Sequence, residues 1–400
     1  PSDTLTAREL LEWGTERVNS EFSERPAVQA DLLIALGNAH HNLGLLDEGI
    51  GLLERAVSLR RATFGERSPE VAEALMNLGQ IHRNNRDFSF ALPFDREALS
   101  ILREVPESDE GRIADVLESL GMSFRNVQRL DSAEVLLRQA LEIREGDPAQ
   151  DGKHTGTTLN LAYVLRGAGK LDEAEVLYEE GIPQYRTLGK RDDGALAVHL
   201  NNLAYLKRVR GDYSAAEDLY REAFEIFAEL HGRGHPTSLM FSANLASSIL
   251  LQGRSQETVD LLRQRTRDAE AQWPEGHWRV GQTYNALGDA LLRAGDIEGA
   301  EEPLQAAVAQ FSRALGEQHN WTSFAWARIA VIRLLTDDPE GGRLFLDRLH
   351  SWSFKERQER GGRLTPDTAG RLEPFLKVLE AVGLEEEHQR FSELLEEGPP

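Results

Sequence analysis

The chain has 400 residues, no cysteine and a formal net charge of −22, which comes from 45 basic and 67 acidic residues. The missing cysteine excludes disulfides, thiolate metal ligands and a thiol nucleophile. The acidic excess argues against nucleic acid as a partner, because binding the phosphate backbone needs a basic surface that releases counterions. No apolar run approaches the roughly 18 residues that a membrane-spanning helix needs, so we expect no membrane insertion of this segment.

The first predicted element is an N-terminal capping helix within residues 1–25. Thr6 stands three residues before Glu9, which is the spacing of a capping box at the start of a helix. Apolar residues follow at helical spacing between Leu10 and Phe22. Because the sequence does not begin with methionine, we expect it to be part of a longer protein.

Residues 26–350 are predicted to form an array of about eight repeats. Each repeat contains Leu or Ile followed by a small residue, and successive small residues are 41 or 42 positions apart. A period this constant indicates stacked supersecondary units. The pairs are Leu36-Gly37, Leu78-Gly79, Leu120-Gly121, Leu161-Ala162, Leu203-Ala204, Leu245-Ala246, Leu287-Gly288 and Ile329-Ala330.

Further small residues follow each pair at fixed distances. A glycine stands seven positions after the small residue in five repeats, where the chain must turn. Alanine or glycine recurs 12 and 19 positions after it, on one face of a second helix that can then approach its neighbours closely. Each repeat is therefore predicted to be a helix, a tight turn and a second helix. Neighbouring repeats would cover each other's apolar faces and form a solenoid.

Some residues depart from this pattern, and the eighth repeat turns at Thr336-Asp337-Asp338-Pro339. Arg86 and Gln128 replace the turn glycine in their repeats. Asp95 stands where the second helix usually carries an apolar residue. We expect the repeats that contain them to be less regular than the others.

Residues 351–400 are predicted to be C-terminal capping helices. The segment LEPFLKVLEAVGLEEEHQRFSELLEE has helical periodicity and is interpreted as an incomplete last repeat. Such an element is expected because a solenoid needs its exposed end faces closed.

The small-residue pattern resembles the tetratricopeptide repeat. The Leu-Gly pair, the turn glycine and the two alanines carry the likeness, and the 42-residue period resembles the kinesin-light-chain-type variant. Linkers such as Gly232 followed by His235-Pro236 are similar to those of that variant. The resemblance implies an all-α, right-handed superhelical solenoid of about eight helix-turn-helix units with helical caps. It also implies a scaffold that binds protein or peptide partners.

A less specific resemblance concerns the first part of the chain, from Leu5 to Arg61. This segment looks like the start of the repeat region that follows the catalytic domain and membrane segment in many bacterial serine/threonine protein kinases. The likeness implies a regulatory or sensory region of a signalling protein. It would place the region outside the cytoplasm if it follows a membrane segment, and the region would otherwise be cytoplasmic.

The sequence contains no motif for catalysis, cofactor binding or metal binding. It lacks a glycine-rich phosphate loop, the His-Arg-Asp and Asp-Phe-Gly kinase motifs, a Gly-x-Ser-x-Gly elbow and a His-Glu-x-x-His helix. His40 and His41 are adjacent, so on a helix they do not form a metal-binding pair. We therefore predict no catalytic, cofactor or metal residues and no enzymatic activity; a kinase domain would lie outside this chain.

A set of polar residues recurs in register on the first helices. Arginine stands four positions after the small residue in repeats two to five, with asparagine and tyrosine at positions that share an arc of about 120°. Asparagine can pair with an extended peptide backbone, and arginine binds carboxylates. The resemblance places first helices on the concave surface, so these residues predict a groove for an extended or acidic segment. The candidates are Asn77, Arg83, Asn84, Arg125, Asn126, Asn160, Tyr163, Arg166, Asn201, Asn202, Tyr205, Arg208 and Asn244.

Other interpretations of these residues remain open. The asparagines could tie neighbouring repeats together, and the arginines could pair with nearby acids or with helix ends. The chain could also be a structural or homo-oligomerisation module with no groove ligand, or hold a small ligand near Tyr163 and Tyr205. Trp278 and Trp321 either anchor a partner or a homodimer, or pack beneath the loops between repeats.

Overall fold

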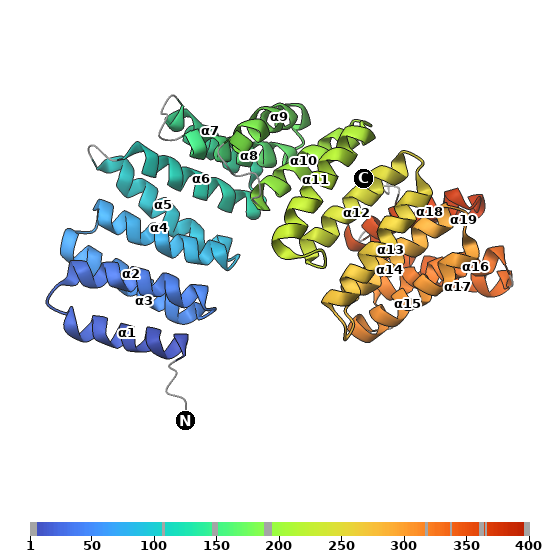
Figure 1. Ribbon diagram of the computed structural model, residues 1–400, viewed down its shortest axis with the longest axis horizontal. Coiled ribbons are helices and arrows are strands. Elements are labelled where there is room, and N and C mark those ends of the chain that lie inside the picture. Colours follow the sequence, from blue (N-terminus) through green and yellow to red (C-terminus); the bar gives the residue numbers. More distant parts are fainter. Residues whose placement is uncertain are drawn as a thin grey trace. The chain divides into compact units, whose positions relative to one another are not determined.

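The computed structural model describes residues 6–105, 109–145, 151–187, 194–316, 319–336, 338–359, 364 and 366–395. All regular secondary structure in these residues is helical, which confirms the all-α prediction (Figure 1). The helices are α1 (Ala7–Glu21), α2 (Pro26–Asn42), α3 (Leu46–Phe64), α4 (Pro69–Asn84), α5 (Phe88–Glu104), α6 (Glu110–Asn126), α7 (Leu130–Arg144), α8 (Asp151–Gly167), α9 (Leu171–Thr187), α10 (Gly194–Val209), α11 (Tyr213–His231), α12 (Pro236–Leu251), α13 (Ser255–Gln272), α14 (Trp278–Arg293), α15 (Ile297–Leu315), α16 (Asn320–Leu335), α17 (Pro339–Glu359), α18 (Pro366–Ala381) and α19 (Glu385–Ser392).

Helices α2 to α17 form consecutive pairs, and each pair is one repeat. The even-numbered helix is the first helix of its repeat and packs against the odd-numbered second helix that follows it. The predicted small residues allow this approach: a Cβ atom added to Gly121 would lie 2.9 Å from Leu137 of the second helix. That distance is too short for two carbon atoms, so the two helices require glycine there.

The turns within the repeats share one backbone conformation. The turn glycines have positive φ, for example 79° at Gly44 and 82° at Gly211. Arg86 and Gln128 adopt the same region, with φ of 65° and 61°. The expected irregularity of their repeats is therefore not seen at the turns, because both residues accept the left-handed conformation that the turn requires.

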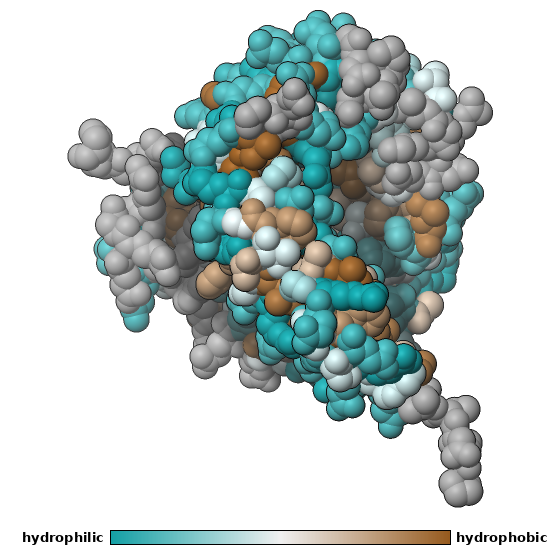
Figure 2. All heavy atoms as spheres, turned by 90° about the vertical axis from the view of Figure 1, so that its left-hand side faces the viewer, coloured by the Kyte–Doolittle hydropathy of each residue, from teal (hydrophilic) through white to brown (hydrophobic). Residues whose placement is uncertain are grey.

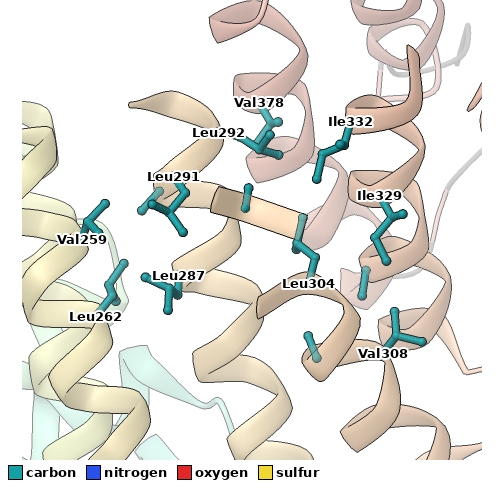
Figure 3. Close-up of a cluster of buried hydrophobic side chains, with 14 of the residues drawn as sticks. Val259, Leu262, Leu287, Leu291, Leu292, Leu304, Val308, Ile329, Ile332 and Val378 are labelled. Atoms are coloured by element: carbon teal, nitrogen blue, oxygen red, sulfur yellow. The ribbon is translucent and has the colours of Figure 1, made fainter. Parts of the chain in front are cut away.

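The chain divides into two compact units, Pro1–Arg191 and Asp192–Pro400. The N-terminal unit contains α1 to α9, and the C-terminal unit contains α10 to α19. Buried leucine, valine and isoleucine side chains from successive repeats form the cores. Figure 3 shows one such cluster in the C-terminal unit, where Leu287 and Leu291 of α14 lie on the side of Val259 and Leu262 of α13. On the face drawn in Figure 2, hydrophilic residues predominate, as the acidic composition suggests.

The N-terminal cap follows the sequence prediction. The side chain of Thr6 accepts a hydrogen bond from the Glu9 amide at 3.2 Å, and the Thr6 amide donates to the Glu9 carboxylate at 2.7 Å. This reciprocal pair is the predicted capping box. At the other end, α17 continues through residue 350, and the proposed division of the chain at that residue remains a prediction.

Helix α18 packs on the first helices of the last two repeats, α14 and α16. Its residue Val378 is fully buried and lies next to Leu292 of α14 in Figure 3. Helix α19 contributes Phe391 to a cluster with Phe375 of α18 and Leu346 of α17. Helix α18 thus covers part of the first-helix side of the last two repeats.

Candidate functional site

The surface formed by the first helices of the repeats is called the first-helix face here, and it carries all the candidate residues. The four arginines occupy the last turns of α4, α6, α8 and α10, and each is partly buried. Arg83, Arg125 and Arg166 belong to the N-terminal unit, whereas Arg208 belongs to the C-terminal unit. Each unit therefore carries its own part of the arginine series.

Arg83 pairs with a carboxylate inside its own repeat. Its guanidinium contacts Asp95 of α5, whose side chain is 1% exposed, and also donates to Gln80 at 2.9 Å. Gln80 in turn donates to Asn84 at 2.6 Å. Arg83 therefore matches the alternative in which arginine pairs with a neighbouring acid. The same ion pair explains why an aspartate can stand at position 95, where the second helix usually carries an apolar residue.

Arg125 has a different environment. Its guanidinium lies 3.9 Å from the centre of the Tyr163 ring, donates to the Tyr163 hydroxyl, and donates to Asn126 at 2.9 Å. Arg166 lies 5.2 Å from the same ring. Burial and the positive charge of Arg166 both lower the pKa of Arg125. Within the described part of the chain, Arg125 has no ion pair with a carboxylate.

The same arginine–tyrosine pairing is also found in the C-terminal unit. The Arg208 guanidinium lies 5.4 Å from the centre of the Tyr205 ring. Both tyrosines are partly buried, and each stands one helical turn before the arginine it meets in its own helix. Cation–π contact holds an arginine in place while leaving its charge available to an anion.

The asparagines connect successive first helices. The Asn77 oxygen accepts from Asn38 at 3.2 Å. Asn160 donates to Glu118 at 2.7 Å, and Asn244 donates to Asn201 at 2.8 Å. In the last repeats, Arg328 takes the position of asparagine and binds Asp289, with one N–O distance of 2.9 Å. These side chains therefore tie repeat to repeat, as one of the alternative interpretations proposed.

Two candidates have other roles in the packing. Asn126 donates back to the Met122 carbonyl at 2.8 Å on its own helix. Asn202 is buried, and its amide nitrogen has no hydrogen-bond partner among the residues that the structure describes. For Arg125, by contrast, the contacts within the described residues are all with neutral groups or with another arginine.

The second helices are also tied to one another, through longer charged side chains. Arg61 of α3 binds Glu97 of α5 at 2.6 Å, and Arg138 of α7 binds Glu173 of α9 at 2.5 Å. All four side chains are about a third exposed or more. Sequence reasoning missed these pairs, although a regular spacing of 35 or 36 residues between partners could have indicated them.

Trp278 and Trp321 pack against the core of the C-terminal unit. Their rings meet edge to face with centroids 4.9 Å apart, and Phe311 lies 5.4 Å from Trp321. Of the two interpretations offered by the sequence, the structure favours packing. This arrangement removes the two tryptophans from the candidates for partner anchors.

The described residues contain no cluster of three or more histidine and acidic side chains that could hold a metal ion. None of their helices combines the length and the apolar character needed to cross a membrane.

Comparison with known proteins identifies the repeat. Two family models, each described as tetratricopeptide repeat, match the chain, one at residues 28–104, 154–227 and 195–271, the other at 113–145 and 280–320. No curated protein sequence matches it.

Solved structures show the same fold. A signal transduction ATPase (STAND protein) with a tetratricopeptide repeat sensor from Pyrococcus horikoshii is 13% identical, with a TM-score of 0.59 over 90% of this chain and 54% of its own. BtubC from P. vanneervenii is 23% identical over 57% of this chain and 92% of its own, with a TM-score of 0.49. A putative kinesin light chain repeat protein from Podospora anserina is 16% identical over 52% of this chain and 99% of its own, with a TM-score of 0.43.

Proposed function

The chain belongs to the tetratricopeptide repeat family, whose repeats generally serve as non-catalytic scaffolds for protein–protein interaction, and on this premise we propose that its first-helix face binds an acidic, extended segment of a partner protein. The binding surface comprises the arginine–tyrosine pairs and the asparagines beside them. The observation that supports the proposal most directly is the environment of Arg125.

Arg125 donates its described hydrogen bonds to neutral groups, and within the residues that the structure describes no carboxylate forms an ion pair with it. Asn126 and the Tyr163 hydroxyl accept its donors, and Arg166 repels it. In a chain with a net charge of −22, two arginines close to one another are an exception to the general acidity. A carboxylate from a partner would relieve that repulsion and gain charge-assisted hydrogen bonds.

The asparagines have a supporting part in this proposal. Asn77, Asn160 and Asn244 already bond to the preceding first helix, so they position that face and would offer a partner only their remaining donors and acceptors. The larger role that we propose is the regulatory or sensory repeat region of a bacterial signalling protein. That role rests on the resemblance of Leu5–Arg61 to the repeat regions of bacterial kinases.

The test compares proteins captured from the source lysate by the wild-type chain and by the triple variant Arg125→Ala, Arg166→Ala and Arg208→Ala. Each charge-assisted contact is worth about 1.5–3 kcal/mol, so losing one weakens binding by roughly tenfold or more. We expect partners to be lost with this variant while the helical circular dichroism is unchanged. The matched control, Arg17→Ala, Arg233→Ala and Arg263→Ala, removes three exposed arginines and should retain the partners.

Identical captures by the wild type and the first-helix variant would contradict the proposal. The competing function is a structural or homo-oligomerisation module, and the asparagine ties between repeats favour it. A solution mass above that of the 44.7 kDa monomer, without any captured partner, would establish that function instead.

A further inference from the structure

The sixth repeat departs from the others at a position that faces the interior. Nineteen positions after the small residue of the first helix, six repeats have a buried small residue, and the last has Leu349. The sixth repeat has Arg265 there, on α13. The small residues are Ala56, Ala98, Ala140, Gly181, Ala223 and Ala307. An arginine at this position introduces a long charged side chain where a methyl group is the usual occupant.

The surrounding helices accommodate Arg265 by moving apart. Helices α12 and α13 come close together over fewer residues than the two helices of any other repeat. The Nε atom of Arg265 donates to the Leu239 carbonyl of α12 at 3.0 Å. Arg265 lines a cavity of about 310 Å³, together with Gln282 and Asn285 of α14. A cavity of this size is sufficient for a small organic ligand.

The positive charge of Arg265 is not neutralised within the described residues of the protein. Among the residues that the structure describes, the Leu239 carbonyl is the one hydrogen-bond partner of Arg265, and no carboxylate forms an ion pair with it. Burial lowers the pKa of Arg265 to about 10, and no acidic group opposes this effect. Asp289 lines the same cavity, but its carboxylate is bound by Arg328.

The cavity also contains unused hydrogen-bonding capacity. The amide oxygen of Asn285 is buried and has no donor within the described residues. Rotating that amide by 180° would place its NH₂ group at the same point, so Asn285 can serve as a donor to a ligand. The remaining wall includes the aromatic rings of Phe311, Trp321 and Phe324. The cavity therefore combines one uncompensated cation, amide groups and an apolar aromatic wall.

We propose that this cavity is a binding site for a carboxylate-bearing ligand, with Arg265 as the group that anchors the carboxylate. Two terminal N–H groups of a guanidinium match the two oxygens of a carboxylate. One uncompensated cation suits a monoanion better than a phosphate or sulfate dianion. The aromatic wall accepts the apolar part of the ligand. This site lies in the C-terminal unit, is distinct from the arginine–tyrosine pairs, and does not depend on the function proposed for them.

The carboxylate could belong to a free small acid or to the end of a peptide, and the probes separate these sources. We would titrate the full chain with sodium benzoate, and separately with acetyl-Ala-Ala-Phe carrying a free C-terminal carboxylate. Benzamide and the tripeptide amide are the uncharged counterparts. Sodium chloride at equal ionic strength corrects for screening. Calorimetry and the melting temperature report binding.

We expect saturable binding of at least one carboxylate probe, a rise in melting temperature, and no response to its amide. Arg265→Ala restores the residue common to the other repeats, so this variant should fold, and it should bind the probe at least about tenfold more weakly. Arg263→Ala removes an exposed arginine of the same helix and should bind as the wild type does. Binding of benzoate alone would indicate a free acid, and binding of the tripeptide would indicate a peptide terminus.

Three results would overturn the proposal. The first is the absence of saturable binding for both carboxylate probes, and the second is equal affinity in the Arg265→Ala variant. The third is tighter binding of sodium sulfate than of either carboxylate, because this would show that the cavity selects charge and not the carboxylate group. Circular dichroism of each variant confirms that a loss of binding is not a loss of folding.

Discussion

Asp95 shows how a single ionisable residue can be held inside a helix pair. Its side chain is 1% exposed and is paired with Arg83, which extends from the last turn of α4. Burial raises the pKa of Asp95 above its ordinary value of 3.8, and the attraction of Arg83 offsets this only in part. The charged carboxylate is therefore less stable in the folded protein than in the unfolded chain.

This raised pKa predicts a pH dependence of stability. Because the folded state holds the Asp95 proton more tightly, its contribution to stability is fully present below pH 3.8 and is lost as the pH rises through the higher, folded-state pKa. We therefore expect the free energy of unfolding of the wild type, minus that of Asp95→Asn, to increase between pH 7 and pH 4.5. Urea denaturation of both proteins at several pH values measures this difference in the free energy of unfolding. A difference that shrinks on acidification would show that the attraction of Arg83 outweighs burial and lowers the pKa of Asp95.

Gln128 tests the cost of a side chain in the left-handed turn. Its φ of 61° is unfavourable for a residue with a Cβ atom by about 1–2 kcal/mol. Glycine recovers this energy but loses about 0.5–1 kcal/mol through its greater freedom in the unfolded chain. We expect Gln128→Gly to raise the free energy of unfolding by about 0.5–1 kcal/mol, as measured with urea. Gly211→Ala, at φ of 82°, should lower the free energy of unfolding. Unchanged stability in both variants would show that a Cβ atom costs nothing in this turn.

Among the elements, α18 is the helix whose packing partners the repeat pattern does not specify. The sequence predicts a C-terminal capping helix here, and in the structure α18 packs on the first helices α14 and α16. In repeats two to five the fourth position after the small residue is arginine, whereas α14 has Leu292 there, against which Val378 packs. Leucine thus replaces arginine at this position in the last two repeats, whose first helices α18 partly covers.

Val378→Asp should release α18 from this position. Val378 is fully buried, and an unpaired carboxylate there would cost about 3 kcal/mol or more. We expect faster amide hydrogen exchange throughout α18, while the amides of α10 to α12 remain protected. Lys377→Asp places the same residue at the exposed neighbouring position and should have little effect. Unchanged exchange in α18 of the Val378 variant would mean that other contacts hold the helix.

At the scale of the whole molecule, the repeat period predicted the architecture because helix pairing is local. The Leu-small pairs and turn glycines determine contacts between residues less than about half a repeat apart, so the order of α2 to α17 follows from them. The position of α18 could not be predicted in this way, since its contacts with α14 are about 80 residues distant in sequence. The helical arc predicts which side of each first helix the polar candidates share. It could not tell that Asn160 turns toward Glu118 or that Arg83 turns toward Asp95, because those choices depend on distances between helices.

The two kinds of tie between repeats have a mechanical consequence. Where α10 meets α12, the first helices are joined by the neutral contact Asn201–Asn244, whereas the second helices α11 and α13 are joined by the exposed ion pair Arg221–Glu257, at 3.8 Å. Dissolved salt screens exposed ion pairs but has little effect on hydrogen bonds between neutral amides. Raising the ionic strength therefore loosens the second-helix edge between these two repeats and leaves the Asn201–Asn244 contact intact. The fifth and sixth repeats then bend like a hinge that is fastened along its first-helix edge.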